Sequence, residues 1–176
     1  PYLYKDNQFD TPTGKGQLFA APWRAPAEIP DADYPLVLCT VREVGHYSCR
    51  SMTGNCAALQ SLADEPGRVQ INPADADERG IAEGQLVWVR SRRGKVITRA
   101  SISERINAGA IYMTYQWWIG ACNELTQDNL DPISRTPETK YCAVQLEAIE
   151  DQRRAEDFAA SSYQTMKTRL IAAVNV

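Results

Sequence analysis

Polar side chains gather in two stretches that lie far apart along the chain. The first stretch follows an apolar run and contains Thr40, Arg42, Glu43, His46, Tyr47 and Ser48. The second contains Asn123, Thr126, Asp131 and Lys140. Arginine and lysine can hold a pyrophosphate, a carboxylate can accept hydrogen bonds from N–H groups of the guanine type, and hydroxyls and amides can orient the remainder. The residue types suit a large polar heterocycle that carries phosphates, although ordinary loops have similar compositions.

Other kinds of chemistry have less support in the sequence. His46 is the only histidine, and neither a G-x-S-x-G pattern, a P-loop nor a G-x-G-x-x-G motif occurs. His46 and Cys49 could form a Cys–His pair, but three residues of spacing in a loop is weak support for one. The basic run 90–95 could bind phosphates, but acidic residues at 75–78 favour a solvated hairpin tip instead.

The composition is that of an ordinary globular domain. The chain has 176 residues, of which 44% are hydrophobic and 23% charged, enough to form a core. A net charge of −3 disfavours a nucleic-acid partner, and no apolar run reaches the roughly 18 residues that span a bilayer. Five cysteines without C-x-x-C spacing favour reduced thiols over a disulfide framework or a zinc ribbon.

Short strand patterns joined by tight turns dominate the middle of the chain. We predict strands at 17–21, 35–40, 69–71, 85–91, 95–103, 110–115 and 140–146. A short helix is predicted at 73–79, because Asn72 can cap it and Pro73 suits its first position. Apolar residues at helical spacing predict an amphipathic helix from Glu150 onward. This pattern favours a closed or semi-closed β-barrel over a parallel α/β sheet.

Three regions follow from these elements. We expect an extended lead-in connector at 1–34, a barrel domain at 35–149 and a C-terminal helix at 150–176. Because the chain begins at Pro1 without an initiator methionine, we also expect it to be part of a longer polypeptide. The barrel core is expected to bury Leu86, Val87, Val89 and Ile111.

Four segments resemble the molybdopterin-dinucleotide-binding domain of molybdenum and tungsten oxidoreductases. They are TPTGKGQLFA at 11–20, PLVLCTVREVGHYSCRSMT at 35–53, VQINPADADERGIAEGQLVWVRSRRGKV at 69–96 and NELTQDNLDPISRTPETKYCAV at 123–144. They occur in the family's order, and the last is most similar to formate dehydrogenases. The four segments together most resemble the selenocysteine-containing formate dehydrogenases. The resemblance implies a mainly β fold, a six-stranded double-psi β-barrel with short helices, which agrees with the predicted strands.

The resemblance also implies a cofactor and a larger enzyme. The cofactor would be a molybdenum, or tungsten, bis-molybdopterin guanine dinucleotide, with a [4Fe-4S] cluster in the upstream domains of the same polypeptide. The whole enzyme would oxidise formate in the cytoplasm and pass electrons to iron–sulfur and hydrogenase subunits. In the family, the metal-ligating and catalytic residues lie upstream, so we expect these 176 residues alone to catalyse nothing.

The cofactor-binding positions of the family correspond here to Thr40, Arg42, Glu43, His46, Tyr47, Ser48, Tyr115, Asn123 and Lys140. One polar cleft is expected to contain Arg42, Glu43, His46, Ser48, Tyr115, Asn123 and Lys140. In the isolated domain this face would be uncovered, which would expose Trp117 and Trp118. The sequence departs from the family at Val41, where glycine is frequent, and at 115–118, where a His-Phe-type stretch is commoner.

Other classes stay open. The chain could be the cofactor-binding domain of another molybdenum or tungsten oxidoreductase, such as a nitrate reductase. A stand-alone barrel enzyme of the pyruvoyl-dependent aspartate decarboxylase type is disfavoured, because such enzymes cleave a Gly-Ser bond and the sequence has no Gly-Ser dipeptide. A non-catalytic partner-binding module, like the double-psi domains of certain ATPases, would not need the polar constellation.

Overall fold

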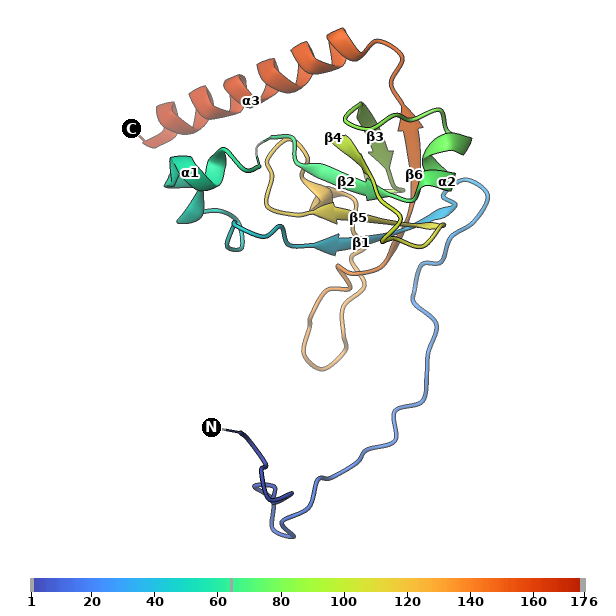
Figure 1. Cartoon of the computed structure of the whole chain (residues 1–176), viewed down its shortest axis with the longest axis vertical. Helices are drawn as coiled ribbons and strands as arrows, with labels where there is room; N and C mark the ends of the chain where they lie inside the picture. Colours follow the sequence, from blue (N-terminus) through green and yellow to red (C-terminus); the bar gives the residue numbers. More distant parts are fainter. Residues whose placement is uncertain (1, 64, 175–176) are drawn as a thin grey trace.

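Six strands close into a β-barrel in this computed structural model, which describes residues 2–63 and 65–174. The strands are β1 (Leu36–Val41), β2 (Arg68–Ile71), β3 (Leu86–Arg90), β4 (Lys95–Ile102), β5 (Ala110–Thr114) and β6 (Cys142–Ala148). Their order around the barrel is β1–β5–β2–β4–β3–β6, and β6 pairs with β1 (Figure 1). The β1–β5 and β2–β4 pairs are parallel, and the others are antiparallel. The double-psi barrel expected from the sequence is confirmed.

The barrel core is formed by side chains that alternate along the strands. In β2, Val69 and Ile71 point into the core, whereas Arg68 and Gln70 are exposed. The residues expected to be buried are fully so: Leu86, Val87, Val89 and Ile111. In β3, Val87 and Val89 point into the barrel core. On the outer face a helix covers Leu86, whereas Trp88 is half-buried and Arg90 is exposed.

Short helices connect the strands. α2 (Pro73–Glu78) begins as predicted, because the Asn72 side chain accepts a hydrogen bond from the backbone N–H of Ala74 at 2.9 Å. It ends before Gly80, whose φ of +62° is readily adopted by glycine. The other short helical segments are the 3₁₀ turn Thr53–Asn55, α1 (Ala57–Gln60) and the 3₁₀ turn Cys122–Glu124.

The C-terminal helix α3 (Gln152–Val174) is attached to the barrel through its first turns. Ala155 and Ala159 pack against Leu86 and Ile97, and Gln152 exchanges two hydrogen bonds with the backbone of Leu86. Figure 1 shows the last turns of α3 extending past the strands. Among the described helices, none combines the length and the apolar character that crossing a membrane requires.

The described part of the N-terminal segment, residues 2–35, is an arm without a strand, so the strand predicted at 17–21 is wrong. Leu18 in that stretch is 97% exposed, and no neighbouring strand lies beside it to complete a sheet. The arm is fixed to the barrel further along, where Glu28 forms a two-pronged ion pair with Arg93 and accepts a hydrogen bond from the backbone of Ala143. Figure 1 shows the arm leading away from the barrel.

Two isoleucines provide a matched test of the core. Replacing the fully buried Ile111 with alanine should lower the free energy of unfolding by about 2–5 kcal/mol, because a cavity remains in the barrel. The same change at Ile133, which is 92% exposed, should alter it by no more than about 0.5 kcal/mol. Urea denaturation of the purified chain measures both values, and similar values for the two variants would contradict this core.

Candidate functional site

Strand register brings Arg42 and Tyr115 together. In the parallel β1–β5 pair, Val41 lies opposite Thr114, so the next residue of each strand leaves the barrel at the same place. The Nε–H of Arg42 donates a hydrogen bond to the Tyr115 hydroxyl at 3.1 Å. This hydrogen bond raises the pKa of Arg42 further above its already high value, so the guanidinium is charged at any physiological pH.

Register also places Lys140 at this end of the barrel. In the antiparallel β1–β6 pair, Leu38 lies opposite Cys142, so Thr40 lies beside the residues that precede β6. The Lys140 ammonium donates a hydrogen bond to the Thr40 carbonyl and lies 5.7 Å from the centre of the Tyr115 ring. The Thr40 hydroxyl is buried and donates to the Thr139 carbonyl at 2.7 Å.

These residues line a pocket of about 360 Å³, which we call the Lys140 pocket. Its walls are Thr40, Arg42, Tyr115, Asn123, Thr139 and Lys140. Asn123 reaches it from the 3₁₀ turn between β5 and β6. With two cations and several hydrogen-bonding groups around one hollow, the pocket is suited to an anionic group such as a phosphate.

A second pocket, of about 450 Å³, shares Arg42 with the first, and we call it the Glu43 pocket. Its walls are Val41, Arg42, Glu43, Val44, Arg68, Gln70, Tyr112 and Thr114. Antiparallel pairing of β2 with β5 sets Gln70 opposite Tyr112 and so builds one wall from two strands. The sequence analysis did not predict Arg68, Gln70 and Tyr112 as site residues. The alternating pattern of β2 does, however, place Arg68 and Gln70 outside the core.

One carboxylate oxygen in the Glu43 pocket lacks a partner. Oε2 of Glu43 is buried and accepts no hydrogen bond from the protein. Burial raises the pKa of this carboxyl above its ordinary value of 4.5, while Arg68 and His46 act in the opposite direction. A buried acceptor left unpaired costs about 1–3 kcal/mol, and an N–H group of a ligand would remove that cost. The residues therefore fit a heterocycle with N–H donors.

The remaining predicted residues lie outside both pockets, so the structure does not bring all of them into one cleft. His46 is buried, with Nδ1 3.1 Å from the Thr53 hydroxyl and Nε2 3.4 Å from the Ala63 carbonyl. Its partners are protein groups because the loop after β1 folds back over it. Tyr47 is exposed, and its ring centre lies 5.4 Å from the Arg42 guanidinium. Ser48 is half-buried, with a φ of +45°.

The stretch after Tyr115 differs from expectation at Trp117. This side chain is 3% exposed, because its indole N–H donates to the Thr114 hydroxyl and its ring packs edge-on against His46. Trp118 is 44% exposed, as predicted. Between Tyr115 and these tryptophans, Gln116 is 2% exposed, and neither polar atom of its side-chain amide has a hydrogen-bond partner. The sequence alone did not determine which side chain of residues 115–118 points inward.

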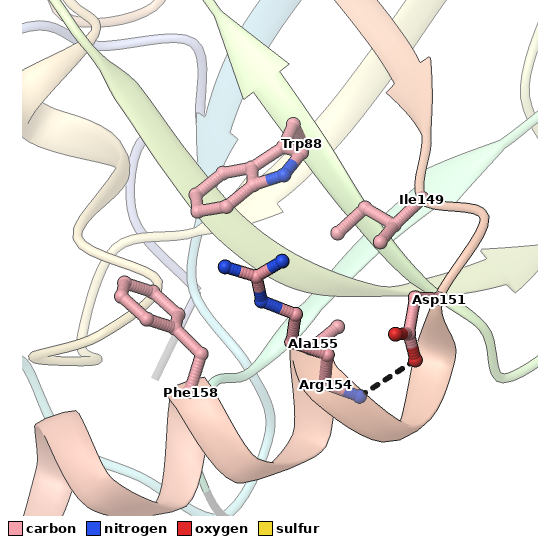
Figure 2. A pocket seen from close by; sticks show the side chains of 6 residues that line it. All are labelled: Trp88, Ile149, Asp151, Arg154, Ala155 and Phe158. Carbon is pink, nitrogen blue, oxygen red and sulfur yellow. Dashed lines mark hydrogen bonds between the residues drawn. The ribbon is translucent and has the colours of Figure 1, made fainter.

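A pocket of about 390 Å³ with apolar walls and two charged residues, Asp151 and Arg154, lies elsewhere, between β3 and α3. Figure 2 shows the Trp88, Ile149 and Phe158 side chains around it, with the Arg154 side chain reaching from α3 toward Trp88. No predicted site residue is among its walls. This pocket therefore lies apart from the two pockets that contain the predicted site residues.

Comparison with known families assigns the barrel to a domain family. A family model described as "Molydopterin dinucleotide binding domain" matches residues 36–143, which include β1 to β5 and the start of β6, Cys142 and Ala143. The chain belongs to this molybdopterin dinucleotide-binding domain family. Of the predicted cofactor-binding residues, all nine lie within the matched range. The matched range also includes the loops that carry the two pockets.

Several relatives are formate dehydrogenases. Formate dehydrogenase H of Escherichia coli (strain K12) is 63% identical over 169 residues, which cover 96% of this chain and 24% of that protein. The F420-dependent formate dehydrogenase subunit alpha of Methanocaldococcus jannaschii is 41% identical over 147 residues, 84% of this chain and 22% of that protein. This molybdopterin dinucleotide-binding domain thus spans about a quarter of the length of the curated relatives it matches.

A solved structure shows the same fold. Acetylene hydratase from Pelobacter acetylenicus aligns with a TM-score of 0.63 and 18% identity, covering 84% of this chain and 25% of that chain. At this identity the likeness concerns the arrangement of the strands. It supports the barrel and carries no information on the substrate.

The pH dependence of stability tests the state of Glu43. Because burial raises its pKa in the folded chain, wild type keeps the full stability of this group below pH 4.5 and loses it as the pH rises through the folded pKa. Glutamine cannot ionise, so Glu43→Gln should match wild type in acid and become the more stable protein toward pH 7–8. Thermal unfolding of the ligand-free chain across this pH range measures the difference, and a constant difference at every pH would contradict the assignment.

Proposed function

We propose that this chain holds a bis-molybdopterin guanine dinucleotide as part of a formate dehydrogenase catalytic subunit. The observation that carries the proposal is the adjacency of two pockets that share Arg42, one with cations and the other with an unpaired carboxylate oxygen. A pterin dinucleotide combines a pyrophosphate with heterocycles that bear N–H groups, so it needs both kinds of partner.

Each polar group of the site has a role in this proposal. Lys140 serves as a point charge for phosphate oxygens, and Arg42 offers a planar donor set beside it. The Tyr115 hydroxyl accepts from Arg42 and keeps its own proton free to donate. Glu43 accepts from N–H groups of a pterin or guanine ring, which would satisfy its buried oxygen. Thr40 and Asn123 complete the polar wall of the Lys140 pocket.

The substrate assignment rests on the relatives. Two formate dehydrogenases, at 63% and 41% identity, favour formate as the substrate over nitrate, which a nitrate reductase would use. When bound, the metal of the cofactor supplies the two-electron oxidation of formate to CO₂. The residues of this chain bind and orient the cofactor and exclude water around its polar groups. The metal, molybdenum or tungsten, is not specified by any of them.

The rest of the enzyme belongs to the same proposal. The upstream domains of the polypeptide would carry the metal ligand, the catalytic side chains and a [4Fe-4S] cluster, and would cover the open face of the two pockets. Iron–sulfur and hydrogenase subunits would accept the electrons in the cytoplasm. His46, Tyr47 and Ser48 remain in the proposed set as residues that shape the loop around Arg42, with Tyr47 lying against its guanidinium.

Lys140→Ala in the full-length enzyme should lower the metal content per protein before it alters the turnover of the metal that remains. A charge-assisted hydrogen bond is worth about 1.5–3 kcal/mol, so we expect retention to weaken by about tenfold or more. Lys167→Ala is the matched control, because Lys167 also lies over a tyrosine ring, that of Tyr163 on α3. Full metal content with lower turnover per metal would make Lys140 a catalytic group and would refute its role as an anchor.

The purified chain by itself should not oxidise formate with an artificial electron-acceptor dye. The physical reason is that the redox-active metal and its ligand lie outside these residues in the proposal. The full-length enzyme assayed in parallel is the positive control. Turnover by metal-free chain would show that catalysis resides in the barrel and would contradict the proposal.

A further inference from the structure

A buried ion pair binds the chain directly after Tyr115, and neither of its members is a wall of the Lys140 pocket. Arg50 and Glu65 approach to 2.6 Å, and their side chains are only 7% and 5% exposed. Arg50 comes from the loop after β1, and Glu65 from the segment that leads into β2. Removing two charges from water is expensive, and such a pair persists only where further hydrogen bonds satisfy it. Those hydrogen bonds indicate what the pair does.

Both members of the pair also contact the stretch that follows Tyr115. The Nε–H of Arg50 donates to the carbonyl of Gln116 at 2.8 Å, and its guanidinium lies 4.3 Å from the centre of the Trp117 ring. The Glu65 carboxylate accepts from the backbone N–H groups of Trp118 at 2.8 Å and Ile119 at 2.9 Å. Arg50 and Glu65 together thus bind three backbone groups within residues 116–119.

Two glycines show how closely this stretch is packed. A Cβ on Gly67 would lie 2.0 Å from the Trp117 ring, and a Cβ on Gly120 would lie 1.9 Å from the Pro66 carbonyl oxygen. A larger residue at Gly67 would have to displace the Trp117 ring, and one at Gly120 would have to displace the backbone at Pro66. The segment around Glu65 and the stretch after Tyr115 are therefore one unit, with no room for adjustment between them.

We propose that Arg50 and Glu65 are positioning residues that orient Tyr115 in the cofactor pocket, an inference that rests on the proposed function. Tyr115 follows the last residue of β5, and the backbone N–H of Tyr115 donates to the Val41 carbonyl at 3.3 Å. On its other side the chain is fixed by the bond from Arg50 to the Gln116 carbonyl. Neither charged side chain is a wall of the Lys140 pocket, so both act on Tyr115 through the backbone of the residues that follow it.

A double-mutant cycle in the full-length enzyme separates positioning from general support of the fold. Arg50→Lys keeps the charge but cannot bind Glu65 and the Gln116 carbonyl with one planar group. We expect it to accelerate the loss of molybdenum during gel filtration by about tenfold, the lower end of the range for residues that orient the groups around a metal. Tyr115→Phe, which removes the acceptor for Arg42, should do the same.

The coupling between the two changes decides the outcome. If Arg50 acts through Tyr115, the double variant should lose metal no faster than the worse single variant. Additive losses would show that Arg50 merely supports the fold and would overturn the inference. Arg99→Lys is the matched control: it disturbs the two-pronged ion pair with Glu156 that ties α3 to the barrel, and metal loss should not change.

Two further measurements keep the result decisive. If Arg50→Lys does not fold, Glu65→Gln serves in its place, since it retains the shape and one acceptor oxygen. If neither Lys140→Ala nor Tyr115→Phe changes metal loss, the proposed function itself fails, and the positioning role fails with it. If both change metal loss but Arg50→Lys and Glu65→Gln do not, only the positioning role is wrong.

Discussion

Parallel pairing of β1 with β5 is the constraint on which the site depends. It makes two strands that are distant in sequence end at the same place, with Val41 opposite Thr114. Arg42 and Tyr115 then leave the barrel as neighbours, and their hydrogen bond follows from the register. The antiparallel partner of β1 brings Lys140 to the same rim. A shift of one residue in either pairing would turn these side chains to opposite faces and would separate them.

The elements were predictable where local signals and tertiary packing agree. Asn72 and Pro73 specify the start of a helix by their own geometry, so α2 begins where the sequence places it. Val87 and Val89 were predicted as core residues because alternate side chains of a strand point to the same face. The strand and turn pattern already favoured a β-barrel, but its six-stranded double-psi topology came from resemblance to a family, as did the membership of Arg42, Tyr115 and Lys140 in one site. No local pattern encodes which distant strands become neighbours.

Predictions failed where the outcome depended on contacts made from outside the segment itself. The stretch at 17–21 has strand-forming residues, but a strand needs a partner, and none lies beside it. His46 was expected in the polar cleft but lines neither pocket, because the loop gives both of its nitrogens protein partners; its role in cofactor binding stays a prediction. Trp117 was expected to be exposed, but it is buried because Arg50 and Gly67 pack against its ring. Each error concerns tertiary contacts that residue types alone do not specify.

Closure of the barrel has a consequence for the molecule before any ligand arrives. Each of the six strands has a hydrogen-bonded neighbour on both sides, so the backbone donors and acceptors of the sheet are used internally. An open sheet would present an edge on which strands of other copies could add, which is a route to aggregation. Here the polar pockets are open at one rim of the barrel, but the closed sheet of the described residues has no free strand edge with which a second chain could pair. Closure of the barrel therefore protects the ligand-free chain from aggregation through strand pairing.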